Sequence, residues 1–451
     1  MKMLFKLTDV LFAAAFLFFG AFYCPGAVAQ PESFVLQDNV GSPINTKVRY
    51  ANETKAVGYF EEDRYGYFML IDLNTATITH KVRINSEFFY VSDFRVLGDT
   101  VYACGRRLVP PEWNGFIMKF HKDSIQGPGS FQFVDIDSTT ELTRMVVYPN
   151  TATSNVEIVA IGYKDVHMGS YVSKQGWIVD CQSVASLVCW LMKRYSNGST
   201  FETFDDIVLT DNYVCTVGCY DGSATAFRKS SRNSFDVMSG IMGTLNYFVH
   251  PDIDPASRLH ATGGNLDSVT VAAYAVNSVG SFTTRIRQYN LSNMTMAYGY
   301  EIPSPEKSEP EELAYSRLYT TYLMLDYLPY IGSGSNCESQ AVTRCPSGVN
   351  AFETYYVPGT GMTSIAASPI GRTFMLAGYG IFAMKQLGTM HSSSCLQKVK
   401  ISKKDLHRDI KEFIRGNRRM SYGGGWNSGS FQLIEPQFER RCLSNNKTEL
   451  E

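Results

Sequence analysis

A short phrase recurs seven times along this chain of 451 residues, and its spacing constrains the fold more than any other feature. The phrase is an apolar stretch that ends in a small residue and usually continues into an aromatic one. Its copies are Val57-Gly58-Tyr59, Cys104-Gly105-Arg106, Ile161-Gly162-Tyr163, Val217-Gly218-Cys219, Ala272-Ala273-Tyr274, Ile331-Gly332-Ser333 and Ala377-Gly378-Tyr379. They lie 46 to 59 residues apart. A repeat of this length predicts an array of similar units, each of which buries its face against its neighbours.

The second copy shows the repeat unit most clearly. Phe94 to Leu97 predicts a short strand, and Thr100 to Arg106 predicts a second one after a Gly98-Asp99 turn. Gly115 to Phe120 predicts a third strand and Ser130 to Asp135 a fourth. Four antiparallel strands in about 50 residues is the size of one propeller blade.

The repeat therefore predicts an all-β chain, a seven-bladed β-propeller of four-stranded antiparallel blades. The 27 Tyr, 28 Phe and 36 Gly favour pleated strands and tight turns. A pair of β-sandwiches and a β-helix or other solenoid are the alternatives. The repeat is also compatible with six or eight blades. Ala273 replaces the fifth glycine, and only residues 358–361 separate the third strand of the sixth unit from the next unit. That gap leaves no room for an outer strand in the sixth unit.

A ring of blades must close, since an open end leaves an unpaired sheet edge. Ser33 to Leu36 is predicted to pair into the final blade. Residues 388–451 are read as a C-terminal elaboration of that blade, with one short helix from Ser402 to about residue 413 or 415. Gly429 to Gln432 is expected to be an outer strand of the same blade. The Pro- and Glu-rich segment from Pro303 to Glu312 is expected to be an exposed acidic loop.

The first 29 residues predict a signal peptide. Lys2 and Lys6 precede an apolar run from Val10 to Phe22, and Ala27-Val28-Ala29 offers a cleavage site. We expect residues 30–451 to form one propeller domain that is exported to a periplasm, a cell surface or the medium. An uncleaved anchor and lipid attachment at Cys24 are the alternatives. No later segment is apolar enough to predict a transmembrane helix.

The charge pattern argues against capture of nucleic acid. The formal net charge is −2 for the whole chain, with 41 basic and 43 acidic residues, and no block of one sign interrupts it.

The ten cysteines fit an oxidising compartment. Cys181 with Cys189, and Cys337 with Cys345, are candidates to close hairpins, and Cys395 with Cys442 are candidates to tie down the C-terminal tail. An odd number of cysteines remains after cleavage, so at least one thiol is unpaired within the chain. The candidates for it are Cys104, Cys215 and Cys219, which could also be buried thiols that pack as small apolar groups.

No catalytic signature accompanies the repeat, so catalytic residues stay unknown and whether the chain is an enzyme stays open. His250-Pro251-Asp252-Ile253-Asp254 with His260 is the densest set of metal ligands, and a solvated turn is preferred there, so neither metal nor cofactor is predicted. Gly332-Ser333-Gly334-Ser335 does not match a nucleophile elbow. The glycine-rich Tyr422 to Trp426 segment lacks the strand–loop–helix order of a phosphate loop.

Residues 46–435 resemble the exported bacterial seven-bladed propellers of unassigned role. The named blade families are not matched, because there is no recurring Trp-Asp dipeptide, no kelch double glycine in register (Gly263-Gly264 stands alone) and no sialidase box. No functional residue is therefore carried over.

Exposed aromatic residues in blade loops are the physical means by which such a scaffold binds. Trp113, in a polar loop beside Pro110 and Pro111, and Trp426 are the candidate ligand-binding residues. The first hypothesis is a non-catalytic propeller that binds a glycan or protein partner at the cell surface through loops on one face. The alternative is an extracellular polysaccharide hydrolase or lyase with acidic residues converging over the central channel.

Overall fold

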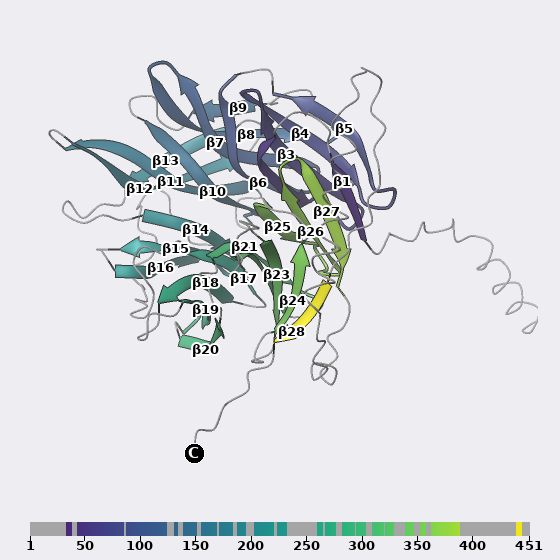
Figure 1. The fold of residues 1–451 in the computed structure, drawn as a ribbon. Coiled ribbons are helices and arrows are strands. Elements are labelled where there is room, and N and C mark those ends of the chain that lie inside the picture. The colour runs from purple at the N-terminus through teal and green to yellow at the C-terminus, as the bar shows by residue number, and fades with distance from the viewer. Residues whose placement is uncertain are drawn as a thin grey trace, which may run out of the picture.

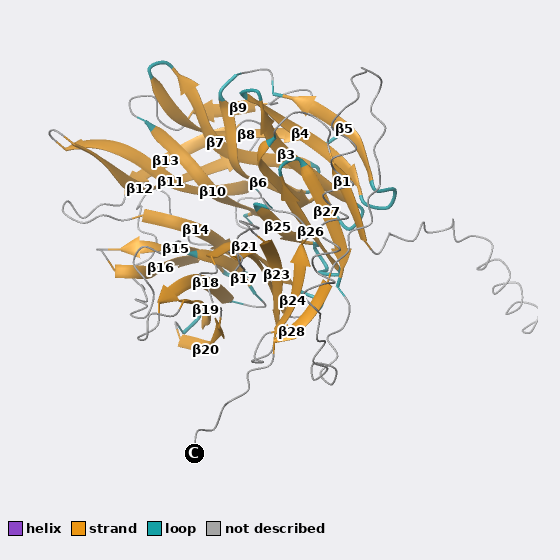
Figure 2. Cartoon of the chain, viewed as in Figure 1, coloured by secondary structure: helices purple, strands orange, loops and turns teal. Residues whose placement is uncertain are grey.

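The computed structural model is an all-β propeller whose blades are mainly four-stranded antiparallel sheets (Figure 1). It describes residues 33–37, 43–84, 87–123, 130–133, 139–150, 155–168, 171–183, 187–194, 203–220, 223–231, 259–264, 267–276, 282–293, 295–303, 309–319, 321–328, 339–346, 352–357, 362–387 and 439–443. Within these residues there is no helix (Figure 2) and hence none that is long and apolar enough to cross a membrane. The expected helix from Ser402 and the expected signal peptide lie outside them.

Hydrogen bonding groups the described strands into seven antiparallel sheets. The first sheet consists of β2 (Ile44–Tyr50), β3 (Lys55–Glu62), β4 (Tyr65–Asp72) and β5 (Thr77–Arg83). The second consists of β6 (Phe89–Leu97), β7 (Thr100–Val109), β8 (Glu112–His121) and β9 (Ser130–Phe133). The third consists of β10 (Thr140–Pro149), β11 (Val156–Met168), β12 (Tyr171–Ser183) and β13 (Leu187–Arg194).

The next two sheets are β14 (Thr203–Leu209), β15 (Tyr213–Tyr220) and β16 (Ser223–Ser231), then β17 (His260–Gly263), β18 (Ser268–Val276), β19 (Phe282–Asn290) and β20 (Thr295–Pro303). The sixth is β21 (Glu309–Ser316), β22 (Thr321–Leu328), β23 (Ser339–Pro346), β24 (Phe352–Val357) and β28 (Glu439–Leu443). The seventh combines β25 (Ser364–Ala367), β26 (Thr373–Gly378) and β27 (Ile381–Gln386) with β1 (Ser33–Gln37).

The first strand of each sheet contacts the first strand of the next. In order these strands are β2, β6, β10, β14, β17, β21 and β25, and β25 contacts β2 again. The first strands therefore surround a common axis, as radial packing of repeats requires.

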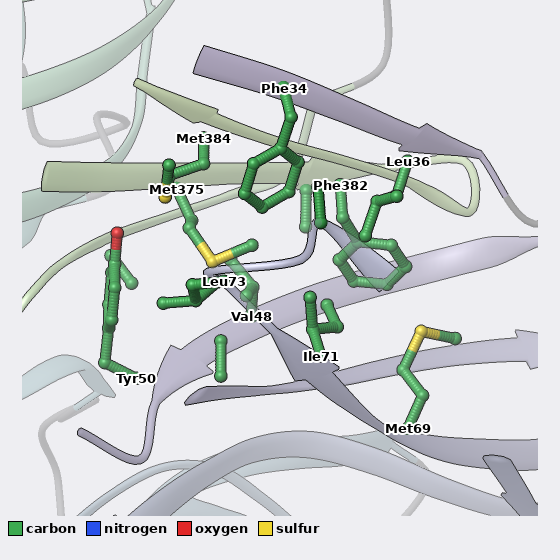
Figure 3. Packing of buried hydrophobic residues seen from close by; sticks show 14 of the residues in the cluster. Phe34, Leu36, Val48, Tyr50, Met69, Ile71, Leu73, Met375, Phe382 and Met384 are labelled. Atoms are coloured by element: carbon green, nitrogen blue, oxygen red, sulfur yellow. The ribbon is translucent and has the colours of Figure 1, made fainter. Parts of the chain in front are cut away.

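Strand β1 closes the last sheet, as the sequence predicts. It pairs antiparallel with β27, with Phe34 opposite Met384 and Leu36 opposite Phe382, and the two strands lie side by side in Figure 1. Apolar side chains of β1, β26 and β27 pack onto those of β2 to β4 in one buried cluster (Figure 3). Because β1 is the outer strand of this sheet, Gly429 to Gln432 is not needed there; these four residues lie outside the described ones.

The described strand of the C-terminal region, β28, extends a different sheet from the one expected. Strand β28 pairs with β24, so it adds a fifth strand to the sixth sheet instead of elaborating the last one. The expectation that the sixth unit lacks an outer strand is also wrong, because β24 fills that position. The apolar phrase around Gly332 misled the assignment, since β22 already ends at Leu328.

Candidate functional site

Three of the repeat glycines, Gly105, Gly162 and Gly218, mark places where the neighbouring first strand bulges. The register shifts between Val91 and Asp93 opposite Gly105, and between Leu142 and Arg144 opposite Gly162. A Cβ on Gly162 would stand 1.8 Å from the carbonyl oxygen of Glu141. Only glycine leaves room for that carbonyl, and a bulge re-aims the side chain that follows it.

Asp93 and Arg144, which directly follow these shifts, belong to a set of residues around the axis. We call it the axial ring and define it by one residue on the first strand of each sheet. In six sheets this residue is opposite the residue that precedes the repeat position of the second strand, and in the sixth sheet it is Glu312, opposite Leu325 of β22. Its members are Arg49, Asp93, Arg144, Asp206, His260, Glu312 and Ser364. Asp206 and Glu312 also directly follow register shifts.

Arg49 links four sheets within the axial ring. Its guanidinium lies 2.9 Å from Asp93 and 2.7 Å from Glu312, and it donates to Ser364 Oγ at 3.0 Å. The side chains of Arg49 and Glu312 are only 11% and 10% exposed, and that of Asp93 is fully buried. Arg49 therefore compensates two buried negative charges at once. Although burial opposes ionisation, Arg49 and its neighbours hold the pKa of Glu312 well below its usual range.

Each ring carboxylate also accepts a backbone N–H of the next sheet. Asp93 accepts from Met145 at 3.1 Å, Asp206 from Ala261 at 2.9 Å and Glu312 from Ile365 at 2.8 Å. The carboxylates of the axial ring therefore connect neighbouring sheets through these hydrogen bonds. Carboxylates bound in this way are poor candidates for general acid–base catalysis.

Glu61, near the β3–β4 turn, has a different environment. Its Oε1 accepts from Asn45 Nδ2 at 2.5 Å and from the Tyr59 hydroxyl at 3.0 Å, and that hydroxyl accepts Val91 N–H at 3.0 Å. Burial raises the pKa of Glu61 to about 7, although these two donors and the more distant Lys47 and Arg106 oppose the shift. Because Oε1 already accepts two hydrogen bonds, a proton on this carboxyl belongs on Oε2.

A stack of aromatic and charged groups lies at the β7–β8 turn. We call it the Trp113 cluster and define it by Trp113, Tyr90, Arg106, Glu141 and Tyr163. The Tyr90 and Trp113 rings are 5.4 Å apart, and the Arg106 guanidinium carbon lies 4.8 Å from the Trp113 centroid. Arg106 also pairs with Glu141 at 2.7 Å, and Glu141 accepts the Tyr163 hydroxyl at 2.5 Å. The cluster joins the second sheet to the third, and Arg106 is 39% exposed.

Trp113 is therefore found in a strand and not in the predicted loop. It is the second residue of β8, opposite Leu108, because the turn comprises only Pro110 and Pro111. The second candidate, Trp426, lies outside the described residues.

The cysteine predictions have mixed outcomes. Cys104, one of the three candidates for an unpaired thiol, is free and buried, and burial raises the pKa of its thiol. Cys215 is also buried, and its thiol donates to the carbonyl of Thr216 at 3.7 Å. Cys181 and Cys189 are opposite each other across β12 and β13, a register compatible with the predicted bridge, which stays a prediction.

The other two bridges depend on residues outside the described ones, Cys337 and Cys395. Cys345 lies near the end of β23 and Cys442 in β28.

One group of possible metal ligands occurs in the described part of the chain, at Asp99, His121 and Asp123. All three are exposed, and the buried Lys122 ammonium lies against both aspartates. A protein cation thus already neutralises this group. The sequence analysis considered a second set of possible metal ligands, from His250 to Asp254 with His260. Residues 250–258 lie outside the described residues, and His260 is a member of the axial ring.

The sequence prediction missed Glu61, Arg106 and most of the axial ring. It placed Glu312 in an exposed acidic loop, which is wrong, because Glu312 lies in β21 and is buried against Arg49. A usable signal was present: a charged residue recurs inside the apolar first strands, as at Asp93 in FYVSDFRVL and Arg144 in TELTRMVVYP.

No family model matches the chain, and no curated protein matches it. Several solved structures are similar to this chain at low sequence identity. A chain of the mitotic checkpoint complex is 11% identical, with a TM-score of 0.43, covering 81% of this chain and 96% of that one. The Dos1 propeller is 9% identical, with a TM-score of 0.46 and coverage of 79% and 95%. Hsv2 of Kluyveromyces lactis is 8% identical, with a TM-score of 0.43 and coverage of 75% and 91%. These likenesses carry no argument about function.

Proposed function

We propose that this protein is a binding propeller that holds a protein partner at the end of the molecule bearing the β7–β8 turn. The observation that carries the proposal is the Trp113 cluster. Trp113 and Arg106 are both partly exposed, and Glu141 holds the Arg106 guanidinium over the indole. A partner would meet a preorganised surface, so little conformational entropy would be lost on binding.

The composition of the cluster favours a protein over a glycan. Trp, Tyr and Arg are the residue types enriched at the energetic centres of protein interfaces. Stacking of a sugar needs an open aromatic face, and Arg106 covers one face of Trp113. A glycan at the cell surface is the competing ligand class.

Substitution of Trp113 tests this proposal. We expect the Trp113→Ala variant to bind a partner selected from purified cell-surface proteins about thirtyfold more weakly than the unmodified protein, since loss of an interface centre costs about 2 kcal/mol or more. Tyr379→Ala is the matched control, because Tyr379 is also a large exposed residue, 55% accessible, in the equivalent turn of the last sheet. Equal affinity of the Trp113→Ala variant and the unmodified protein would refute the site. Selective binding to a glycan array, lost in the same variant, would replace the protein partner by a glycan.

Glu61 supports the alternative function, a hydrolase or lyase acting on a polysaccharide. A carboxyl with a pKa of about 7 can act as an acid or a base near neutral pH. In that case Glu61→Gln abolishes turnover in a screen of polysaccharide substrates while the fold is retained. Turnover unchanged in Glu61→Gln would exclude Glu61 from the chemistry.

We further propose export and a count of seven blades. Residues 1–29 have the composition of a signal peptide, and the seven sheets with their cycle of first-strand contacts support the count. Mass spectrometry of the protein recovered from its native source tests export: a mature chain that begins at Gln30 is expected, and an intact N-terminus would contradict it.

A further inference from the structure

Several charged groups interact near the axis. Lys47, Arg49, Arg95 and Arg144 are basic, and Asp93, Asp206 and Glu312 are acidic; the carboxyl of Glu61 is also within the influence of Lys47. Arg49 and Arg95 both bind Asp93 directly, at 2.9 and 2.8 Å. Lys47 and Arg144 are the two of these cations that have no hydrogen-bonded carboxylate among the described residues.

Lys47 is a buried cation without an ion-pair partner in the described part of the chain. It lies two residues before Arg49 on β2, on the same face of the strand, and only 9% of its surface is exposed. Its ammonium forms neither an ion pair nor a hydrogen bond with the described residues. A buried ammonium in this state is costly unless an anion compensates it.

Arg144 is only loosely paired. Its closest carboxylate contact is 3.8 Å, from Nε to Asp206 Oδ1, which is too long for a hydrogen bond, and it has no other ion pair or hydrogen bond among the described residues. Its side chain is 10% exposed. The donors of the guanidinium fork, which match an oxyanion in geometry, thus remain available.

The two cations act on each other. After burial, Arg144 is the largest cause that lowers the pKa of Lys47, to about 8, and Arg49 lowers it too, while Glu312 and Asp93 act in the opposite direction. The Lys47 ammonium of the first sheet and the loosely paired Arg144 guanidinium of the third therefore repel each other in a buried place. An anion between them would remove that repulsion.

From this arrangement we propose that Lys47 and Arg144 form a binding site for a small oxyanion, a phosphate-like or carboxylate group, on the propeller axis. The site is distinct from the Trp113 cluster. It needs no partner protein, so its success or failure is independent of the proposed function.

Calorimetric titration with sulfate and with acetate tests the site, because neither anion changes its charge near pH 8; chloride at equal ionic strength is the reference. We expect sulfate or acetate to bind, and the affinity to fall at least tenfold in Lys47→Met and in Arg144→Met. Lys47→Arg keeps the charge and should retain binding, and Lys55→Met, which removes an exposed lysine paired with Asp123, should be neutral. The stronger of the two anions identifies the ligand class.

Proton uptake gives a second readout that a purely structural lysine would not give. At pH 8, Lys47 is about half protonated, so anion binding should take up to about 0.5 proton from the buffer, and this uptake should vanish in Lys47→Met. In the absence of any oxyanion, Lys47→Met should melt at a higher temperature than the unmodified protein, because it removes the uncompensated charge. Binding of neither anion at millimolar concentration, or equal binding by the unmodified protein and Lys47→Met, would overturn the proposal.

Discussion

Glu61 and Glu312 are both buried glutamates, and their neighbours give them opposite acid–base behaviour. Arg49 lies 2.7 Å from Glu312 and stabilises its charged form, so the pKa of Glu312 is low. The hydrogen bonds that Glu61 receives from described residues come from the neutral Asn45 and Tyr59, and burial dominates, so its pKa is about 7. The groups that contact a buried carboxyl therefore determine whether it is charged near neutral pH.

This contrast predicts opposite pH dependences of stability. The pKa of Glu61 is higher in the folded than in the unfolded chain, so its contribution to the free energy of unfolding falls as pH rises from about 4.5 to about 7. Glu61→Gln should remove that fall, up to about 3 kcal/mol. Denaturant unfolding at several pH values measures it, with the exposed Glu87→Gln as control. An unchanged pH profile in Glu61→Gln would contradict the assignment. Glu312 acts in the opposite sense, since its stabilisation is present above about pH 4.5 and is lost in more acidic solution.

At the scale of single elements, the repeat glycine and the bulge of the adjacent strand belong together. The glycine admits the bulged carbonyl, and the bulge turns a charged side chain to the axis. The sequence pattern that revealed the repeat therefore also marks the strands that carry the axial ring, although the ring itself was not predicted.

Alanine at Gly162 tests this relation. A methyl group there would collide with the backbone of Glu141 at 1.8 Å, so Gly162→Ala should destabilise the protein by about 1–3 kcal/mol or more. Gly115→Ala is the matched control, since its nearest contact would be Thr140 Oγ1 at 3.2 Å, a flexible side-chain atom. Denaturant unfolding compares the two variants. Equal free energies of unfolding of the two variants would contradict the prediction, since they would show that the bulge at Glu141 can move to admit the methyl group.

At the scale of the whole molecule, closure depends on a short strand from the beginning of the chain. Phe34 and Leu36 of β1 are each only 1% exposed and pack with Phe382 and Met384 of β27 against the first sheet (Figure 3). Pairing of β1 with β27 covers a sheet edge that would otherwise be open.

Phe34→Ala should therefore destabilise the whole propeller by about 3–5 kcal/mol, as is usual for a buried phenylalanine. It should also speed up proteolysis within β27, because the edge of that strand opens. Thermal unfolding and limited proteolysis measure both effects, with the exposed Gln37→Ala as control. If Phe34→Ala unfolded at the same temperature as Gln37→Ala, β1 would not be the closing strand.

The all-β class, the repeat unit and the closure by β1 were predictable because they depend on local patterns. Apolar alternation, turn residues and glycine spacing are readable along the chain. Errors arose where strand ends depend on pairing: β7 and β8 extend past the predicted loop and include Trp113. The place of β28 could not be read from the sequence, because its partner β24 is remote in the chain.

The sequence by itself determined that the chain forms repeated antiparallel sheets, since periodicity and glycine spacing are properties of neighbouring residues. Only the tertiary structure decided which charges meet. Arg49 and Glu312 are 263 positions apart in the chain, and Lys47 and Arg144 belong to different sheets. Closing the ring brings them to one axis, and burial there makes each charge depend on its neighbours, which a linear pattern does not record.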